Sequence, residues 1–425
     1  MAAAPGSNGG DAKNDAASEE TLTSHLPLDI VEEILCRLPV KHLRQLCCVS
    51  KSWNSLISRD SKFAKKHLIF STSTSNRHRH HLALSSMNSS RELLLTHSPI
   101  STIFTSSVVS TTHATQLRFL LNNNDVYYNS TGFSTCDGIL CFGINKSLSL
   151  LCNPSIRKFK LLPPLKISCD QTLYTLVYDR FINNYKIFAL SFFNNNKKPQ
   201  NFDALDNWIQ ELPDHHIFHR PPEVNVHILG TDYWRRIRDH HVFPRPGIVM
   251  SDGEGIFVSD TVNWLAYDTY SSSQFIVSLD LENESYRKLL PPLCHLQSKT
   301  SVSLGVLRDC LSLLTHSDNF DKFFGVWIMK EHRNEESWIK LLSIPHVRMR
   351  DCGFCTYTKV LYISEDNRVL MEFLKNPLRF SLVIYDSVKD TFKIPEIQNK
   401  FHGHDQMVSI VNIYLESLIS PFFQH

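Results

Sequence analysis

Residues 25–68 are patterned for a pair of short amphipathic helices, and no other stretch limits the possible folds as much. Apolar residues in its first half recur on one helical face: Ile30, Val31, Ile34, Leu35 and Leu38. Pro27 suits the first turn of such a helix, and Pro39 ends it because proline disfavours helix in the residue before it. A second helical face is predicted from the spacing of Leu43, Leu46, Val49, Trp53, Leu56 and Ile57.

This stretch is close to the size below which a chain cannot stabilise its own fold. Domains under roughly 40 residues usually need a disulfide, a metal or a partner. The stretch has neither a disulfide framework nor zinc-ligand spacing. Its excess of apolar positions therefore predicts a partner that completes the core. The alternative is a helical hairpin that packs on the C-terminal part of its own chain.

The same residues resemble the F-box, a segment that docks on the Skp adaptor of cullin–RING ubiquitin ligases. The resemblance rests on Leu26-Pro27, Glu33-Ile34-Leu35, Arg37-Leu38-Pro39-Val40, Cys48-Val49-Ser50-Lys51-Ser52-Trp53 and Leu56-Ile57. It implies a Skp adaptor, and through it the ligase, as partners. It implies adaptor-binding residues at Leu26, Pro27, Ile30, Ile34, Leu35, Leu38, Pro39, Leu46, Val49 and Trp53. Some of these must instead hold the helices together, and the sequence does not sort them.

Composition argues against several classes of protein. Of 425 residues, 42% are hydrophobic and 20% are charged, and the formal net charge of +2 gives no global attraction to nucleic acid or membranes. The 11 cysteines have no regular spacing, which fits reduced thiols of the cytosol or nucleus. Residues 1–24 lack the apolar region of a signal peptide and are expected to be disordered. No apolar run is long enough for a transmembrane helix.

Basic residues gather in and just after the F-box-like stretch: Lys41, Arg44, Lys51, Lys62, Lys65 and Lys66. A solvated helix face explains them better than a nucleic-acid site. Such a face would also complement an acidic adaptor.

The residue composition of the chain changes twice after residue 68. Residues 69–90 form a polar tract that predicts a linker. From residue 91 onward, short apolar runs alternate with turn residues, which predicts strands and hairpins without a sustained helical period. The expected organisation is a disordered tail (1–24), an F-box-like helical domain (25–68), a polar linker (69–90) and an all-β domain (91–425).

A weak repeat refines the prediction for the β domain. Trp234, Tyr286, Trp338 and Phe392 lie 52, 52 and 54 positions apart. A period near 50 with about four strands per unit is typical of kelch-like propeller blades, in which a repeated aromatic fills the blade-to-blade interface. We therefore predict an α+β multidomain protein with an irregular β-propeller of six or seven blades. A pair of β-sandwiches is the alternative. The apolar stretch 408–419 predicts a closing strand that removes a sheet edge.

The β domain also resembles a family, the F-box associated interaction domain of plants. Three short motifs begin the resemblance: Cys136-Asp137-Gly138-Ile139-Leu140-Cys141, Asn153-Pro154-Ser155-Ile156-Arg157-Lys158 and Leu162-Pro163-Pro164. Val262-Asn263-Trp264-Leu265 and Tyr414-Leu415-Glu416-Ser417-Leu418 continue it toward the C-terminus. Residues 194–245 depart from the pattern, so blade boundaries are least certain there.

Motifs for catalysis, metal binding or cofactor binding do not stand out. The chain has no glycine-rich phosphate loop, no GxSxG and no HExxH. Cys352 and Cys355 form a lone CxxC without a second ligand pair, and the pairs His215-His216 and His240-His241 fit polar loops. We therefore expect no catalytic residue, no metal site and no cofactor.

The sequence as a whole predicts the substrate-recognition subunit of a Skp–cullin–F-box ubiquitin ligase. The F-box would dock on the adaptor, and the β domain would capture a protein substrate whose identity the sequence does not give. Two alternatives stay open. One is a kelch-like interaction scaffold without a ligase role, and the other is an enzyme with a site in the propeller channel. The expected location is the cytoplasm, the nucleus or both.

Overall fold

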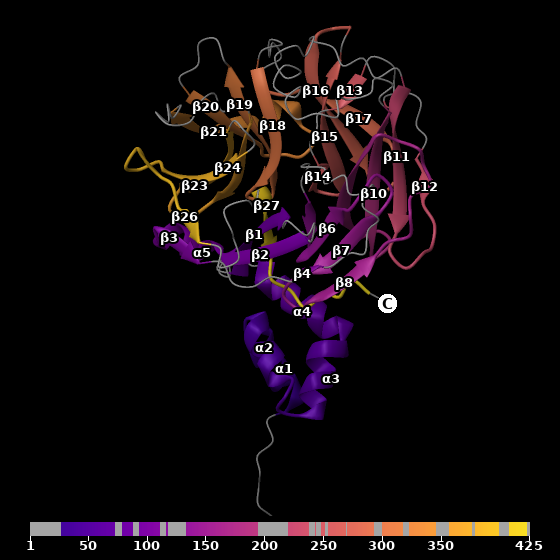
Figure 1. The fold of residues 1–425 in the computed structure, drawn as a ribbon, viewed down its shortest axis with the longest axis vertical. Coiled ribbons are helices and arrows are strands. Elements are labelled where there is room, and N and C mark those ends of the chain that lie inside the picture. Colours follow the sequence, from indigo (N-terminus) through magenta and orange to yellow (C-terminus); the bar gives the residue numbers. More distant parts are fainter. Residues whose placement is uncertain are drawn as a thin grey trace, which may run out of the picture.

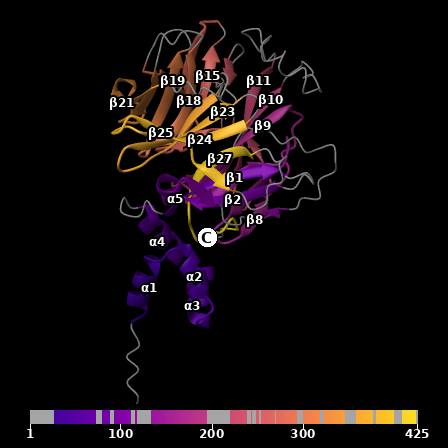
Figure 2. The ribbon, with the colours of Figure 1, turned by 60° about the vertical axis from the view of Figure 1, so that its left-hand side comes forward.

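The computed structural model places a small helical domain at one end of a large ring of β-sheets (Figure 1). The described residues are 27–72, 79–87, 93–110, 116–117, 133–193, 220–237, 243, 248–250, 254–268, 270–292, 300–317, 323–345, 357–375, 379–398 and 408–422. Figure 2 shows from a second direction that the helices extend from one face of the ring. The expected disordered tail and Leu26 lie outside the described residues.

Four helices make up the helical domain: α1 (Leu28–Cys36), α2 (Val40–Leu46), α3 (Lys51–Arg59) and α4 (Ser61–Thr72). Pro27 and Pro39 occupy the positions just before α1 and α2, as proline's fixed backbone favours. The predicted second helix is in fact two helices. Ser50 separates them because its side chain accepts a hydrogen bond from Trp53 N at 3.1 Å and so begins a new helix.

Six sheets form the ring, and we number them as blades in chain order. Blade 1 contains β27 (Val408–Leu415), β1 (His80–Met87), β2 (Leu93–Pro99) and β4 (Gln116–Leu117). Blade 2 contains β5 (Ser134–Cys136), β6 (Ile139–Gly143), β7 (Ser149–Asn153) and β8 (Lys158–Leu161). Blade 3 contains β9 (Gln171–Asp179), β10 (Asn184–Phe193), β11 (Arg220–Ile228) and β12 (Arg235–Arg236).

The remaining blades follow the same antiparallel order. Blade 4 contains β13 (Ile248–Met250), β14 (Ile256–Val258), β15 (Thr261–Asp268), β16 (Ser273–Asp280) and β17 (Tyr286–Leu289). Blade 5 contains β18 (Thr300–Leu307), β19 (Cys310–Ser317), β20 (Phe323–Met329) and β21 (Trp338–Pro345), with a short 3-10 helix at Glu335–Ser337. Blade 6 contains β22 (Tyr357–Ile363), β23 (Arg368–Lys375), β24 (Arg379–Asp386) and β25 (Thr391–Lys393).

The ring closes where the two ends of the β domain meet. β27 pairs antiparallel with β1, with Leu82 opposite Ile413. β3 (Val108–Ser110) and β26 (Glu396–Gln398) form a second, parallel link between the two ends, near α5 (Ile100–Thr105). The predicted closing strand is therefore confirmed for residues 408–415. The predicted linker is wrong at residues 80–87, because this segment is β1, which pairs with both β2 and β27.

The apolar core lies mainly between neighbouring blades. One cluster joins blades 3 and 4, and others join blades 4 and 5, blades 5 and 6, blades 6 and 1, and blades 1 and 2. Packing of this kind confirms the predicted propeller and excludes the β-sandwich alternative. The six blades fall within the predicted six or seven.

The aromatic repeat marks the outer strands. Tyr286 and Trp338 begin β17 and β21, and Phe392 lies in β25. The indole N–H of Trp338 donates to Leu290 O of blade 4 at 3.1 Å, and that of Trp234 donates to Pro163 O beyond β8 at 2.8 Å. Both bonds cross from one blade to the preceding one, as the repeat predicted.

Candidate functional site

The helical domain leaves apolar side chains uncovered. Ile30 and Ile34 on α1 are 47% and 49% exposed, and Val49 between α2 and α3 is 64% exposed. Other apolar side chains of the four helices fill the core of the domain: Leu35, Cys36, Val40, Leu43, Ile57 and Phe63. The domain therefore does not need the exposed residues for its own packing, and their clustering on one small domain is typical of a protein-binding surface.

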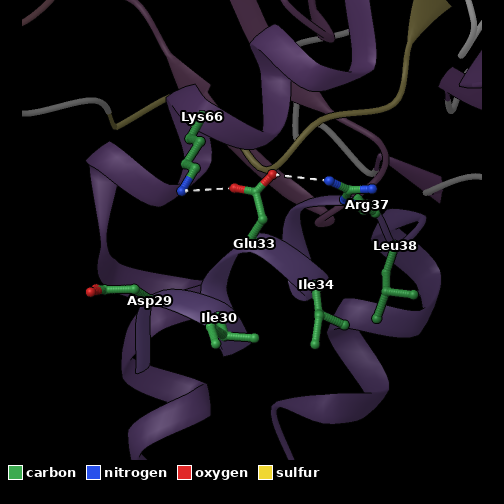
Figure 3. A pocket seen from close by; sticks show the side chains of 7 residues that line it. All are labelled: Asp29, Ile30, Glu33, Ile34, Arg37, Leu38 and Lys66. Carbon is green, nitrogen blue, oxygen red and sulfur yellow. Dashed lines mark hydrogen bonds and ion pairs between the residues drawn. The ribbon is translucent and has the colours of Figure 1, made fainter. Parts of the chain in front are cut away.

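An open groove of about 640 Å³ runs along α1 (Figure 3). Its lining residues are Asp29, Ile30, Glu33, Ile34, Arg37, Leu38 and Lys66. In Figure 3, Ile30 and Ile34 of α1 and Leu38 in the turn after it follow one another along the groove. We call these three residues the α1 row. The row gives the groove an apolar edge on which a partner's side chains could pack.

A polar edge borders the α1 row. Glu33 Oε1 accepts a hydrogen bond from Arg37 Nη2 at 3.3 Å, and Glu33 Oε2 lies 3.3 Å from Lys66 Nζ (Figure 3). Hydrogen bonds from Arg37 and Lys66 lower the pKa of Glu33 below its ordinary value. These groups are exposed, so they add specificity and orientation rather than much stability.

A buried arginine fastens the helical domain to the propeller. Arg79, directly before β1, is 1% exposed. Its guanidinium donates to Arg37 O at 2.6 Å and to Ser71 Oγ, and it lies 3.1 Å from His67 Nε2. Burial lowers the pKa of His67, and the charge of Arg79 lowers it further, against the opposing bond to Leu38 O. A neutral imidazole can therefore pack against the guanidinium without charge repulsion.

Glu416, directly after β27, makes a second polar connection between the propeller and the helical domain. Its Oε1 accepts a hydrogen bond from Val40 N, the first residue of α2, at 3.3 Å. Its Oε2 lies 3.7 Å from His81 Nε2, and its own N–H donates to Arg79 O at 3.1 Å. Burial alone would raise the pKa of Glu416, but His81, the Val40 N–H and Arg79 lower it below its ordinary value. The carboxylate thus stays charged at the joint.

A shared apolar core adds to the polar contacts that Arg79 and Glu416 make between the helical domain and the propeller. One cluster combines the helical core residues with Cys136, Ile139, Leu176 and Tyr185 of blades 2 and 3 and with Leu418 and Ile419. The core of the helical domain is therefore continuous with the apolar core between blades 2 and 3. The groove along α1 is therefore held in a fixed direction relative to the propeller.

Comparison with known proteins agrees with this two-part architecture. A family model described as the F-box domain matches residues 23–65, and one described as the F-box associated beta propeller domain matches residues 83–421. The chain belongs to the F-box proteins with an F-box associated β-propeller. The resemblance and the fold class predicted from the sequence are both confirmed.

Several plant relatives cover nearly the whole F-box chain. An F-box/kelch-repeat protein of Arabidopsis thaliana is 31% identical over 427 residues, covering 96% of this chain and 99% of the relative. The F-box protein CPR1 of Arabidopsis thaliana is 22% identical over 405 residues, covering 91% and 88%. A putative F-box only protein 9 of the same plant is 23% identical over 354 residues, covering 83% and 85%.

The structure sorts the residues predicted to bind the adaptor. Those that present surface are Pro27, Ile30, Ile34 and Val49; those partly buried are Leu38, Pro39, Leu46 and Trp53. Leu35 is 2% exposed and belongs to the core, so a contact role for it does not fit this structure. Leu35 supports the F-box from inside, because it belongs to the helical core on the side of α1 that packs against α4. Packing on the chain's own β domain, held open as an alternative above, therefore occurs alongside an exposed face.

Sequence reasoning missed Arg79, His67 and Glu416. Arg79 belongs to a tract that was interpreted as linker, and its burial depends on contacts with α1 and α4. One signal was available, because Glu416 stood in a motif of the resemblance, Tyr414-Leu415-Glu416-Ser417-Leu418. The sequence did not predict that Arg79 and Glu416 lie next to each other.

The described residues show neither a metal site nor a membrane-spanning helix. Among the described residues, no group of three or more His, Cys, Asp or Glu side chains could hold a metal ion. Cys352, Cys355 and the two histidine pairs lie outside the described residues. No described helix is long and apolar enough to cross a membrane.

Proposed function

We propose that this F-box protein is the substrate-recognition subunit of a Skp–cullin–F-box ubiquitin ligase of the cytoplasm or nucleus. The exposed α1 row beside a filled helical core is the observation that carries the proposal. Ile30 and Ile34 are each about half exposed. Covering both would contribute roughly 1.5–3 kcal/mol to binding, which the isolated chain leaves unused.

Charge supports an acidic partner for this surface. Lys41, Arg44, Lys51 and Arg59 are exposed on α2 and α3. Those two helices carry no aspartate or glutamate. An adaptor with acidic residues around an apolar patch would complement this face and associate faster at low salt.

The fixed joint supports a receptor rather than a loosely tethered binding module. Arg79 and Glu416 hold the F-box to blade 1 through buried polar contacts. A substrate bound to the propeller would then sit at a defined position relative to the adaptor and the ligase. Ubiquitin transfer would gain from the high local concentration of substrate lysines, with no catalytic residue needed in this chain.

Chain topology supports substrate capture on the propeller face away from the F-box. Hairpin turns near the F-box are short: 137–138, 259–260 and 308–309. Lys65 Nζ on α4 donates to Asn183 Oδ1 in the β9–β10 turn at 2.9 Å, which fixes these turns on the F-box side. The opposite strand ends are joined by longer segments, including 194–219 and 346–356. Long connections on a rigid scaffold are where binding residues usually occur.

Adaptor pull-down with matched isoleucine variants tests the docking step. Ile34→Asp places a charge in the α1 row, and we expect it to weaken adaptor binding at least about tenfold. Ile69→Asp is the matched control, because Ile69 is 71% exposed on α4 outside the groove. Leu35→Asp would unfold the core and is uninformative. Equal adaptor binding by both isoleucine variants would contradict the proposed docking face.

Ubiquitination of captured partners separates a receptor from a scaffold. Proteins that co-purify with the full chain are incubated with the reconstituted ligase. A receptor predicts that ubiquitination of a bound partner needs Ile34 but that its capture does not. Capture without ubiquitination, despite normal adaptor binding, would favour the kelch-like scaffold.

A further inference from the structure

The outer strand of blade 2, β8, forms a second exposed surface, near the C-terminus (Figure 1). Phe159 and Leu161 on this strand are 49% and 52% exposed. The outer strands β12, β17, β21 and β25 expose no large apolar side chain. Blades 4 and 5 bury the aromatic residue of the repeat, Tyr286 and Trp338, against a neighbouring blade. β8 therefore departs from the pattern of the ring, because its apolar side chains remain at the surface.

The backbone of β8 is open to a further strand. β8 pairs with β7 on one side, and among the described residues no strand pairs with its other side. Leu162, directly after β8, donates its N–H to Ser149 O of β7 at 3.0 Å. Hydrogen bonding alternates along an antiparallel strand, so the peptide groups of Phe159 and Leu161 point away from β7. An edge of this kind offers N–H and C=O groups to an extended segment.

The side chains of β8 divide between the two faces of the blade. Phe159 lies opposite Cys152, which belongs to the apolar cluster between blades 1 and 2. Successive side chains of a strand point to opposite faces, so Leu161 shares the face of Phe159. Lys158 and Lys160 take the other face, toward blade 3. A segment that matched both faces would alternate apolar residues with residues that complement lysine.

Positive charge prevails around this edge. The segment 146–170 contains one acidic residue, Asp170, and these basic residues: Lys146, Arg157, Lys158, Lys160 and Lys166. Asp170 lies 3.9 Å from Lys146, so the other four basic residues have no acidic partner within the segment. Lys160 Nζ lies 5.8 Å from the ring centre of Phe422, which is itself 52% exposed. Asp232, in the turn before β12, offsets one of these charges at most. The edge therefore complements an acidic partner.

We propose that the outer edge of blade 2 binds an extended acidic segment of a partner protein, which pairs with β8 as an additional strand. Apolar residues at alternate positions of that segment pack on Phe159 and Leu161. The acidic residues between them face Lys158 and Lys160. A second copy of β8 is a poorer occupant, because its lysines would stand opposite like charges. This surface is independent of adaptor docking, because no residue of β8 lines the groove along α1.

A peptide series tests the site in the full-length protein. The fluorescent probe is a short peptide of alternating glutamate and valine, compared with a lysine–valine analogue and with a peptide that has all its valines before its glutamates. Fluorescence anisotropy is expected to show binding of the alternating acidic peptide at least about tenfold tighter than either comparison peptide. N-methylation of its backbone nitrogens removes the strand donors and should weaken binding at least about tenfold. Equal binding of the block or N-methylated peptide, or no binding at millimolar concentration, would overturn the proposal.

Two matched pairs of variants locate the peptide on β8. Lys160→Glu is expected to weaken binding of the acidic peptide at least about tenfold, whereas Lys340→Glu changes it less than about twofold. Both lysines lie on outer strands, each with Nζ 5.8 Å from an aromatic ring centre. Leu161→Asn should weaken binding at least about threefold, whereas Ile394→Asn should not, although the two native side chains are 52% and 54% exposed. Equal binding within either pair would contradict the assigned edge.

Other occupants of the edge give different results in the same samples. A dimer detected by light scattering that Leu161→Asn dissociates would assign the edge to a second copy of the chain. Displacement of the acidic peptide by an equal concentration of oligothymidylate would assign it to nucleic acid. Either result would overturn the proposal. Adaptor pull-down is expected to be unchanged in all of these variants, which keeps failure of this site separate from failure of the proposed ligase role.

Discussion

Replacing Glu372 by glutamine removes a carboxyl group that the propeller holds away from water. Glu372 is 4% exposed on β23, opposite Lys359 on β22. Burial, together with the charge of Glu254, raises the pKa of Glu372 from 4.5 to about 7, although the ammonium of Lys359 opposes the shift. The neutral acid is therefore the form that the fold accommodates.

The sign of the pH effect follows from this shift. The folded chain binds the Glu372 proton more tightly than the unfolded chain, so this group makes folding less favourable as pH rises from about 4.5 to about 7. The difference between the two values corresponds to about 3 kcal/mol above that window. We therefore expect Glu372→Gln to have little effect at pH 5 and to raise the free energy of unfolding by up to about 3 kcal/mol at pH 8.

Urea unfolding at the two pH values measures this difference. Glu282→Gln serves as the control because Glu282 is an exposed carboxyl in the turn before β17. It removes one negative charge without changing a buried site. An equal effect of Glu372→Gln at both pH values would refute ionisation as the cause. Destabilisation at pH 8 alone would mean that the ionised carboxylate gains more from Lys359 than it loses through burial.

Three further substitutions test the joint and the ring. Arg79→Met should lower the free energy of unfolding by about 2–5 kcal/mol in urea, because buried acceptors lose their donor, whereas Arg59→Met on an exposed position should have almost no effect. Gly138→Ala should cost about 2–3 kcal/mol in thermal unfolding, because φ is +81° and a Cβ would overlap the segment after β27. The control Gly230→Ala, at φ +101° with open space, should cost only about 1 kcal/mol. Trp338→Phe should lose about 1–2 kcal/mol with the bond to blade 4, and an unchanged urea midpoint would contradict that role.

Repetition made the propeller predictable. Blades 4, 5 and 6 reuse one outer-strand pattern, and the spacing of Tyr286, Trp338 and Phe392 reports it directly. The pattern arises because every blade must fill the same gap against its neighbour. Apart from its closing strand, blade 1 was not predicted, because it has no such unit in one continuous segment. Its inner strand is β27, and its next strand is β1, which stands far away in sequence.

The sorting of the F-box residues needed tertiary structure. Ile34 and Leu35 are adjacent on one broad apolar arc of α1, and helical periodicity assigns both to the buried side. Only the direction from which α4 approaches leaves Ile34 exposed and buries Leu35. Arg79 illustrates the same limit from the polar side. Its charge predicts exposure, and its burial becomes tolerable through the Arg37 carbonyl after α1, the Ser71 hydroxyl of α4 and the nearby carboxylate of Glu416.

The attachment of the F-box and the closure of the ring share one structural unit. Arg79 leads into β1 and Glu416 follows β27, and these two strands pair with each other to close blade 1. The Arg79 carbonyl also accepts a hydrogen bond from Glu416 N. Separation of β27 from β1 would therefore break the antiparallel closure of blade 1 and displace Glu416, which binds Val40 N, in the same event. The β27–β1 pairing therefore closes blade 1 and also positions Arg79 and Glu416. If this pairing is lost, the F-box cannot keep all of its polar contacts with the propeller.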